Sequence, residues 1–181
     1  MRTSLLIIAI FFFFFNVDAQ NNSLKEIYEG TFAVNSITAW RGKTRVAVPL
    51  QIPANATGFY YTVYVSKRKT FRPEARKLVF DVLADRMGTS SENADRANEI
   101  LVKEQGKYED INIYLLPSEQ DSQLFEKRMN YDFKALKEWK DIGEEVTFVP
   151  TNGTRQTLYL GFLNTNNTIG LDVYLKVAAK Y

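Results

Sequence analysis

The chain has 181 residues, a formal net charge of +2, and neither histidine nor cysteine. Without cysteine there is no disulfide, thiol nucleophile or thiolate metal site, and without histidine there is no imidazole base or imidazole ligand. The small net charge also excludes a bulk polycation. These exclusions remove most of the chemistry that a secreted enzyme would use.

The N-terminus has the pattern of a secretory signal peptide. Arg2 precedes an apolar run at residues 5–15, and Val17-Asp18-Ala19 resembles a cleavage site, so we expect residues 1–19 to be removed. A run of about 11 apolar residues is shorter than the roughly 20 that span a bilayer, which disfavours a retained anchor. No later run approaches that length, so no transmembrane segment is expected in the mature chain.

The remaining residues, 20–181, are predicted to form one secreted or periplasmic domain. This length is enough to bury a core without disulfides, and no internal repeat or linker divides it. A cysteine-free exported chain favours a bacterial periplasm or exterior, because eukaryotic secreted domains of this size more often carry disulfides.

The first part of this domain is predicted to form three strands. Strand-forming residues fill 27–34 and 44–52, and apolar residues alternate along the second of these segments. Pro49 has no N–H to donate to a neighbouring strand, so this segment is expected at a sheet edge or bulge. Residues 59–66 alternate most clearly and predict the third strand.

The hydrophobic period changes at about 71–105, where a two-helix insertion is predicted. Apolar residues from Ala75 to Leu83 recur at the spacing of one helix face. Thr89 and Glu92 match a capping box at the start of a second helix. The insertion separates two regions of strand character.

Strand character returns in the second half of the chain. Residues 111–116 alternate, and the charged stretch 119–141 is expected to form short helices or an ordered loop. The strongest β-pattern lies at 158–162 and 171–177. The Asn-rich turn between these two runs, at 164–168, predicts a hairpin.

Four of these segments carry a resemblance to a known type of domain. They are the Pro-bounded strand before residues 59–63, residues 111–116 followed by Phe125, residues 158–162 with their Asn-rich turn, and the terminal strand ending at 177–179. Together they resemble the jelly-roll β-sandwiches of bacterial pre-peptidase C-terminal domains and Golgi-dynamics domains.

The resemblance covers roughly residues 46–179, without the helical insertion. It implies a mainly β, antiparallel, jelly-roll-like sandwich with a two-helix insertion at about 71–105. It also implies a non-catalytic accessory or interaction module, and it carries over no site residue.

Three aromatic residues are candidate binding residues. Trp40, Tyr60 and Tyr64 have ring faces of the kind that stack on sugars. The alternative, which we favour for these residues and for Trp139, is packing in the core or across strands. Exposed rings would indicate a carbohydrate-binding module.

A basic cluster follows the third predicted strand. Lys67, Arg68, Lys69 and Arg72 are candidate contacts for an anionic glycan or a lipid head group. The alternative is a solvated surface that keeps the protein soluble. No nucleic acid partner is expected, because the chain has a signal peptide and lacks an aromatic RNA-binding motif.

Carboxylates and metal ligands give weaker signals. Glu109, Asp110, Glu144 and Glu145 are candidates for a glycan-active enzyme, since glycoside hydrolysis needs two carboxyl groups. Adjacent strand residues point to opposite faces, so Glu144 and Glu145 are not expected to act as a pair. The acids between 81 and 99 alternate with basic residues and contain no calcium-loop motif, so no metal and no cofactor is expected.

Four Asn-x-Ser/Thr triplets are present. They begin at Asn21, Asn55, Asn152 and Asn166. They are candidate glycan sites in a eukaryotic host. Chance occurrence in an Asn- and Thr-rich sequence is the favoured explanation.

The sequence therefore predicts a secreted or periplasmic, non-catalytic binding domain with an unknown protein or glycan partner. The first alternative is a carbohydrate-binding module that uses exposed aromatic residues. The second is a carboxylate-dependent, glycan-active enzyme.

Overall fold

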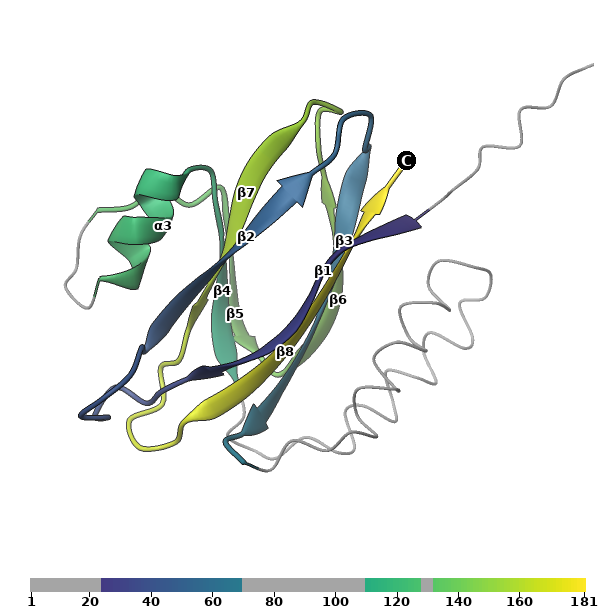
Figure 1. The fold of residues 1–181 in the computed structure, drawn as a ribbon. Coiled ribbons are helices and arrows are strands. Elements are labelled where there is room, and N and C mark those ends of the chain that lie inside the picture. Colours follow the sequence, from purple (N-terminus) through teal and green to yellow (C-terminus); the bar gives the residue numbers. More distant parts are fainter. Residues whose placement is uncertain (1–23, 70–109, 128–131) are drawn as a thin grey trace, which may run out of the picture.

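The protein is mainly β and contains two antiparallel sheets of four strands each (Figure 1). The computed structural model describes residues 24–69, 110–127 and 132–181, and strands make up 58% of them, which confirms the expected mainly β, antiparallel class. The first sheet contains, in spatial order, β1 (Leu24–Val34), β8 (Leu171–Lys180), β3 (Gly58–Lys67) and β6 (Glu144–Pro150). The second contains β2 (Arg45–Ile52), β7 (Gln156–Leu163), β4 (Ile111–Leu116) and β5 (Lys137–Ile142).

The core lies between the two sheets and follows the alternation in the sequence. In β2, Val48, Leu50 and Ile52 are buried, whereas Pro49 and Gln51 are exposed. Residues of both sheets contribute to one hydrophobic cluster, so the sheets pack face to face. The alternating positions of β2 therefore place side chains as predicted, whereas β3 is buried along nearly its whole length.

Pro49 lies on an edge strand, as expected. β2 pairs only with β7 and ends the second sheet. A missing N–H on the outer edge leaves no neighbouring carbonyl unpaired, so proline is tolerated there.

The predicted hairpin at the C-terminal end is wrong. β7 pairs with β2 and β4, whereas β8 pairs with β1 and β3, so the connection between them crosses from one sheet to the other. Asn164 explains this path, because it is fully buried and its side-chain amide donates to the carbonyls of Val34 (3.2 Å) and Ile169 (2.8 Å). A polar turn between two alternating strands does not distinguish a hairpin from a crossover between sheets.

The stretch 119–141 contains a helix and a strand. Helix α3 (Glu119–Glu126) is the one helix in the described residues, and β5 follows it. The two-helix insertion predicted at about 71–105 lies outside the described residues. β5 and β6 were not predicted from the sequence.

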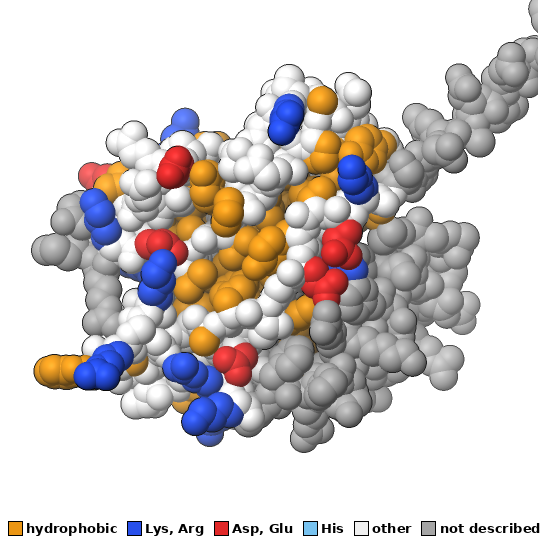
Figure 2. All heavy atoms as spheres, in the orientation of Figure 1, with side chains coloured by type: hydrophobic (Ala, Val, Ile, Leu, Met, Phe, Trp, Pro, Cys, Tyr) orange, Lys and Arg blue, Asp and Glu red, His pale blue; other side chains and the backbone are white. Residues whose placement is uncertain are grey.

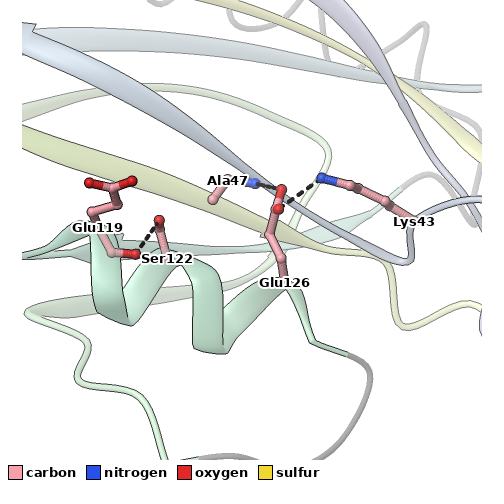
Figure 3. Close-up of polar contacts among 5 residues, drawn as sticks. All are labelled: Lys43, Ala47, Glu119, Ser122 and Glu126. Atoms are coloured by element: carbon pink, nitrogen blue, oxygen red, sulfur yellow. Dashed lines mark hydrogen bonds and ion pairs between the residues drawn. The ribbon is translucent and has the colours of Figure 1, made fainter.

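Helix α3 lies on the outer face of the second sheet and is held at both ends. Ser118 caps its N-terminus by accepting the backbone N–H of Asp121 (3.1 Å). Phe125, fully buried, packs over Gly161 of β7, where an added Cβ would lie 2.8 Å from the ring. Glu126 accepts the backbone N–H of Ala47 (3.1 Å), which attaches the helix to edge strand β2 (Figure 3).

Candidate functional site

Three segments far apart in the sequence meet at one end of the sandwich, at the lower left in Figure 1. We call this end the tip; it comprises residues 35–44, 67–69 and 164–170. The backbone N–H groups of Ile37 and Thr38 donate to the carbonyls of Asn166 (3.0 Å) and Asn167 (3.2 Å). The N–H of Arg68 donates to the carbonyl of Gly170 (2.8 Å). Hydrogen bonds thus join all three segments.

The β1–β2 segment of the tip carries exposed apolar side chains. Trp40 is 92% exposed and Ile37 is 52% exposed. Across the described residues, the other large hydrophobic side chains that are exposed, Leu136 and Phe148, lie outside the tip. Two large apolar side chains are thus exposed to solvent within one short loop.

The backbone of this loop is fixed although its side chains are exposed. The N–H of Asn35 donates to the carbonyl of Lys43 (2.8 Å), and the Asn35 side chain donates to the carbonyl of Arg41 (3.1 Å). Gly42 has φ +94°, a left-handed conformation that glycine adopts without strain. Arg68 donates to the Asn35 side-chain oxygen, which connects the loop to the end of β3.

The tip is also strongly cationic. It contains five Lys or Arg residues and no Asp or Glu: Arg41, Lys43, Lys67, Arg68 and Lys69, all of them exposed. Figure 2 shows Lys and Arg side chains gathered at the lower left and lower edge, beside a protruding hydrophobic group. Two acids border the tip: Glu126 pairs with Lys43 (2.8 Å), and Asp172 accepts the backbone N–H of Lys69 (2.8 Å).

The structure brings together two candidates that appeared independent in the sequence. Trp40 and the cations Lys67, Arg68 and Lys69 belong to one surface, because the ends of β1 and β3 lie at the same end of the first sheet. Arg72 lies outside the described residues. Ile37 and Arg41 were missed by sequence reasoning, because a single apolar residue between Ser36 and Thr38 gives no sign of exposure.

The two candidate tyrosines lie in β3, and both pack against protein. Tyr64 is 7% exposed, which leaves no accessible ring face for a sugar. Tyr60 is half-buried, with its ring centre 4.9 Å from that of Phe148 in β6. Trp139 packs against Tyr61 at 5.3 Å, and the ammonium of Lys137 lies over its ring at 4.8 Å.

Two of the candidate carboxylates, Glu144 and Glu145, do not face the same side of their strand. Glu144 and Glu145 are consecutive residues of β6, so they point to opposite faces of the sheet. Glu109 lies outside the described residues, and Asp110 immediately precedes β4. No group of three or more acids that could hold a metal is found within residues 24–69, 110–127 and 132–181.

The carboxyl of Asp121 has a lowered pKa for a structural reason. The Ser118 hydroxyl and the backbone N–H of Lys134 (2.8 Å) both donate to its carboxylate and favour the charged form. Asp121 stands at the start of α3, so this shift belongs to the capping of the helix.

No model of a known protein family matches the chain, and no curated protein matches its sequence. In the part of the chain that the structure describes, no helix has the length and apolar character needed to cross a membrane.

Proposed function

We propose that the chain is an exported, non-catalytic binding domain whose tip contacts an anionic ligand. The observation that carries this proposal is the exposure of Trp40, 92%, on a loop that is held by hydrogen bonds and shares the tip with five cations. A fixed loop loses little conformational freedom on binding, so its exposed side chains contribute more of their contact energy to affinity. Tryptophan and arginine are also the residues most often found at the energetic centre of interfaces.

A jelly-roll topology is part of this proposal. The strand orders β1-β8-β3-β6 and β2-β7-β4-β5 support it, because strands pair as first with eighth, second with seventh, third with sixth and fourth with fifth. A long four-pair ribbon wrapped across two sheets produces this order. The domains that the sequence resembles serve as accessory modules, which agrees with a binding role.

Export is proposed from the signal-like residues 1–19, and a non-catalytic role from the residue types present. The chain lacks histidine and cysteine, and Glu144 and Glu145 face opposite sides of β6. Binding through aromatic and basic side chains needs none of the missing groups. A periplasmic or extracellular surface would place the tip among anionic glycans and lipids.

Binding to dextran sulfate, with neutral dextran as the reference, tests the proposal. Trp40→Ala is expected to weaken binding to dextran sulfate by tenfold or more, since it truncates a residue of the kind that dominates interfaces. Phe148→Ala is the matched control, because Phe148 is an exposed aromatic residue outside the tip. Equal losses in the two variants, or no binding to the polyanion, would contradict the proposal.

The alternative of a carbohydrate-binding module is favoured by the same residue, Trp40. Stacking on a neutral sugar ring requires the aromatic face but not the cations. Glycan binding that Trp40→Ala abolishes, and that a fivefold increase in salt leaves unchanged, would select this alternative. Binding by the cations would instead weaken with salt.

A further inference from the structure

We infer that the tip docks on the surface of an anionic lipid bilayer, with Trp40 and Ile37 entering the interface and the surrounding cations contacting lipid phosphates. This inference rests on the proposed function and names the ligand of the same surface. It is distinguished from binding of a soluble polyanion by the role it assigns to Ile37.

Ile37 is the first observation that favours a bilayer. An aliphatic side chain makes no contribution to recognition of a phosphate or sulfate group in water, yet Ile37 is 52% exposed in the same loop as Trp40. Its exposure does not come from a frayed backbone, since its N–H donates to the carbonyl of Asn166 at 3.0 Å. A bilayer interface accepts both side chains, because it offers an apolar layer beneath the head groups.

The side chain of Trp40 fits the same environment. Tryptophan concentrates at membrane interfaces, where the ring is apolar and the indole N–H remains near water and head groups. At 92% exposure, nearly the whole ring is available for transfer.

The backbone of the loop is the second observation. The N–H groups of Asn35, Ile37, Thr38 and Ala39 all donate to carbonyls within the protein, at 2.8 to 3.2 Å. The hydroxyl of Thr38 also donates to the carbonyl of Asn167. Polar groups that are already satisfied lose little when water is removed, so this part of the loop can approach an apolar layer at low cost.

The charge of the tip supplies the electrostatic half of the binding. Arg41 and Lys43 follow Trp40 in its own loop, and Lys67, Arg68 and Lys69 come from the neighbouring end of β3. Each Lys or Arg near an anionic bilayer strengthens binding by about fivefold, an effect that salt screens. Insertion of apolar side chains and attraction of the cations to anionic lipid each give weak membrane binding alone, and together they give stable docking.

Vesicle binding tests the inference directly. The chain from Gln20 onward is mixed with phosphatidylcholine vesicles, with or without about one-third phosphatidylglycerol, and sedimented. Starting at Gln20 prevents the apolar run at 5–15 from binding lipid by itself. We expect binding to the anionic vesicles, a strong decrease with salt, and little binding to pure phosphatidylcholine.

Paired variants separate insertion from charge. Ile37→Ser is expected to weaken vesicle binding by about fivefold to tenfold, through loss of apolar contact. Leu136→Ser is the matched control, since Leu136 is also 52% exposed but lies outside the tip. The double substitution of Arg41 and Lys69 by Ser is expected to lower the affinity for anionic vesicles by about 25-fold, since each cation contributes about fivefold.

Fluorescence reports whether Trp40 enters the bilayer. The chain has two tryptophans, so Trp139→Phe leaves Trp40 as the sole source of the signal. Anionic vesicles are expected to shift its emission to shorter wavelength, and lipids brominated near the head group are expected to quench it.

The possible results are distinguishable. Vesicle binding that does not depend on Ile37, or dextran sulfate binding without vesicle binding, would overturn the membrane inference and leave the proposed anion-binding function standing. Failure to bind either probe would overturn both. Binding to both vesicle types with equal affinity would also contradict the role assigned to the cations.

Discussion

Asn164 forms buried hydrogen bonds at the point where the chain crosses from one sheet to the other. It is fully buried, and its side-chain oxygen accepts the backbone N–H of Asn166 (2.9 Å) in addition to the two bonds that it donates. A buried carbonyl that loses its donor costs about 1 to 3 kcal/mol. The amide therefore stabilises the start of the β7–β8 connection and, through it, one wall of the tip.

We expect Asn164→Ala to lower the free energy of unfolding by about 2 to 4 kcal/mol, because it leaves the carbonyls of Val34 and Ile169 without this donor. Asn167→Ala, at an exposed position of the same connection, serves as the control and should change stability by less than about 0.5 kcal/mol. Urea denaturation measures both. Similar midpoints for the two variants would show that the buried amide has no special role.

Gly42 and Gly153 form a matched pair for testing the conformation of the tip. Both have positive φ, +94° and +76°. An added Cβ at Gly42 would lie 1.7 Å from the side-chain nitrogen of Asn35. A Cβ at Gly153 would have no heavy atom within 4 Å apart from those of Gly153 and its two chain neighbours. The two positions thus share backbone strain and differ in crowding.

Gly153→Ala should therefore lower the free energy of unfolding by about 1 to 2 kcal/mol, the usual penalty for an alanine in the left-handed backbone conformation. Gly42→Ala should lower the free energy of unfolding by about 1 to 2 kcal/mol more than Gly153→Ala does, because Asn35 must move and lose its hydrogen bond to the carbonyl of Arg41. Thermal or urea unfolding gives the stabilities, and dextran sulfate binding should fall only for Gly42→Ala. A tip that binds normally after this substitution would argue against the need for a fixed loop.

At the scale of elements, the sequence predicts most strands but not which strands pair. Pro49 marks an edge strand because proline affects local hydrogen bonding directly. By contrast, β5 reads Lys-Glu-Trp-Lys-Asp-Ile, and mostly exposed polar side chains give it little alternation. The sequence predicts one hairpin for β7 and β8 because the turn residues are local, whereas one of the Asn164 bonds at the crossover reaches 130 residues back to Val34.

Glu126 at the end of α3 protects the free edge of β2. Its carboxylate accepts the backbone N–H of Ala47 and pairs with Lys43, as Figure 3 shows. An unpaired edge N–H is a starting point for association with another strand. Lys43 is 62% exposed, so the contribution of the ion pair is small and the bond to the backbone is the more important contact.

Glu126→Ala is expected to reduce stability by about 1 to 2 kcal/mol and to increase self-association through β2. Glu119→Ala is the control within the same helix, since the Glu119 side chain bonds only to Gln123 among the described contacts (3.2 Å). Urea denaturation and light scattering distinguish the variants. If both remain monomeric and equally stable, α3 does not protect the edge in the way described.

At the scale of the whole molecule, the candidate site arises from the wrapping of the chain. Trp40 and Lys67 to Lys69 were identified from the sequence by residue type, but their proximity depends on three segments that end at the same side of two sheets. The third segment, 164–170, supplies carbonyls and no charged side chain. Such carbonyl positions have no signature in the sequence, so the tip could be predicted in parts and not as one surface.

The response of the protein to alkaline pH also involves both sheets. Burial raises the pKa of Tyr28 in β1, of Tyr61 in β3, and of Tyr114 in β4, the last to about 12 from its ordinary value of 10.0. The folded protein thus holds these protons at a pH where the unfolded chain releases them. Stability is then at its full value below pH 10 and declines as the pH rises through 10 towards 12.

Tyr61→Phe tests this directly, because it keeps the ring that packs against Trp139 and removes the titrating hydroxyl. That hydroxyl is buried without a hydrogen-bond partner in the described structure, so its removal relieves a desolvation cost and should leave stability at neutral pH unchanged or raise it by up to about 1 to 3 kcal/mol. Urea midpoints measured from about pH 7 to pH 11 should fall less steeply in the variant than in the wild type. Parallel pH profiles would mean that ionisation of Tyr61 is not coupled to unfolding, whereas a flatter profile would show that the packing between the sheets sets the alkaline limit of the fold.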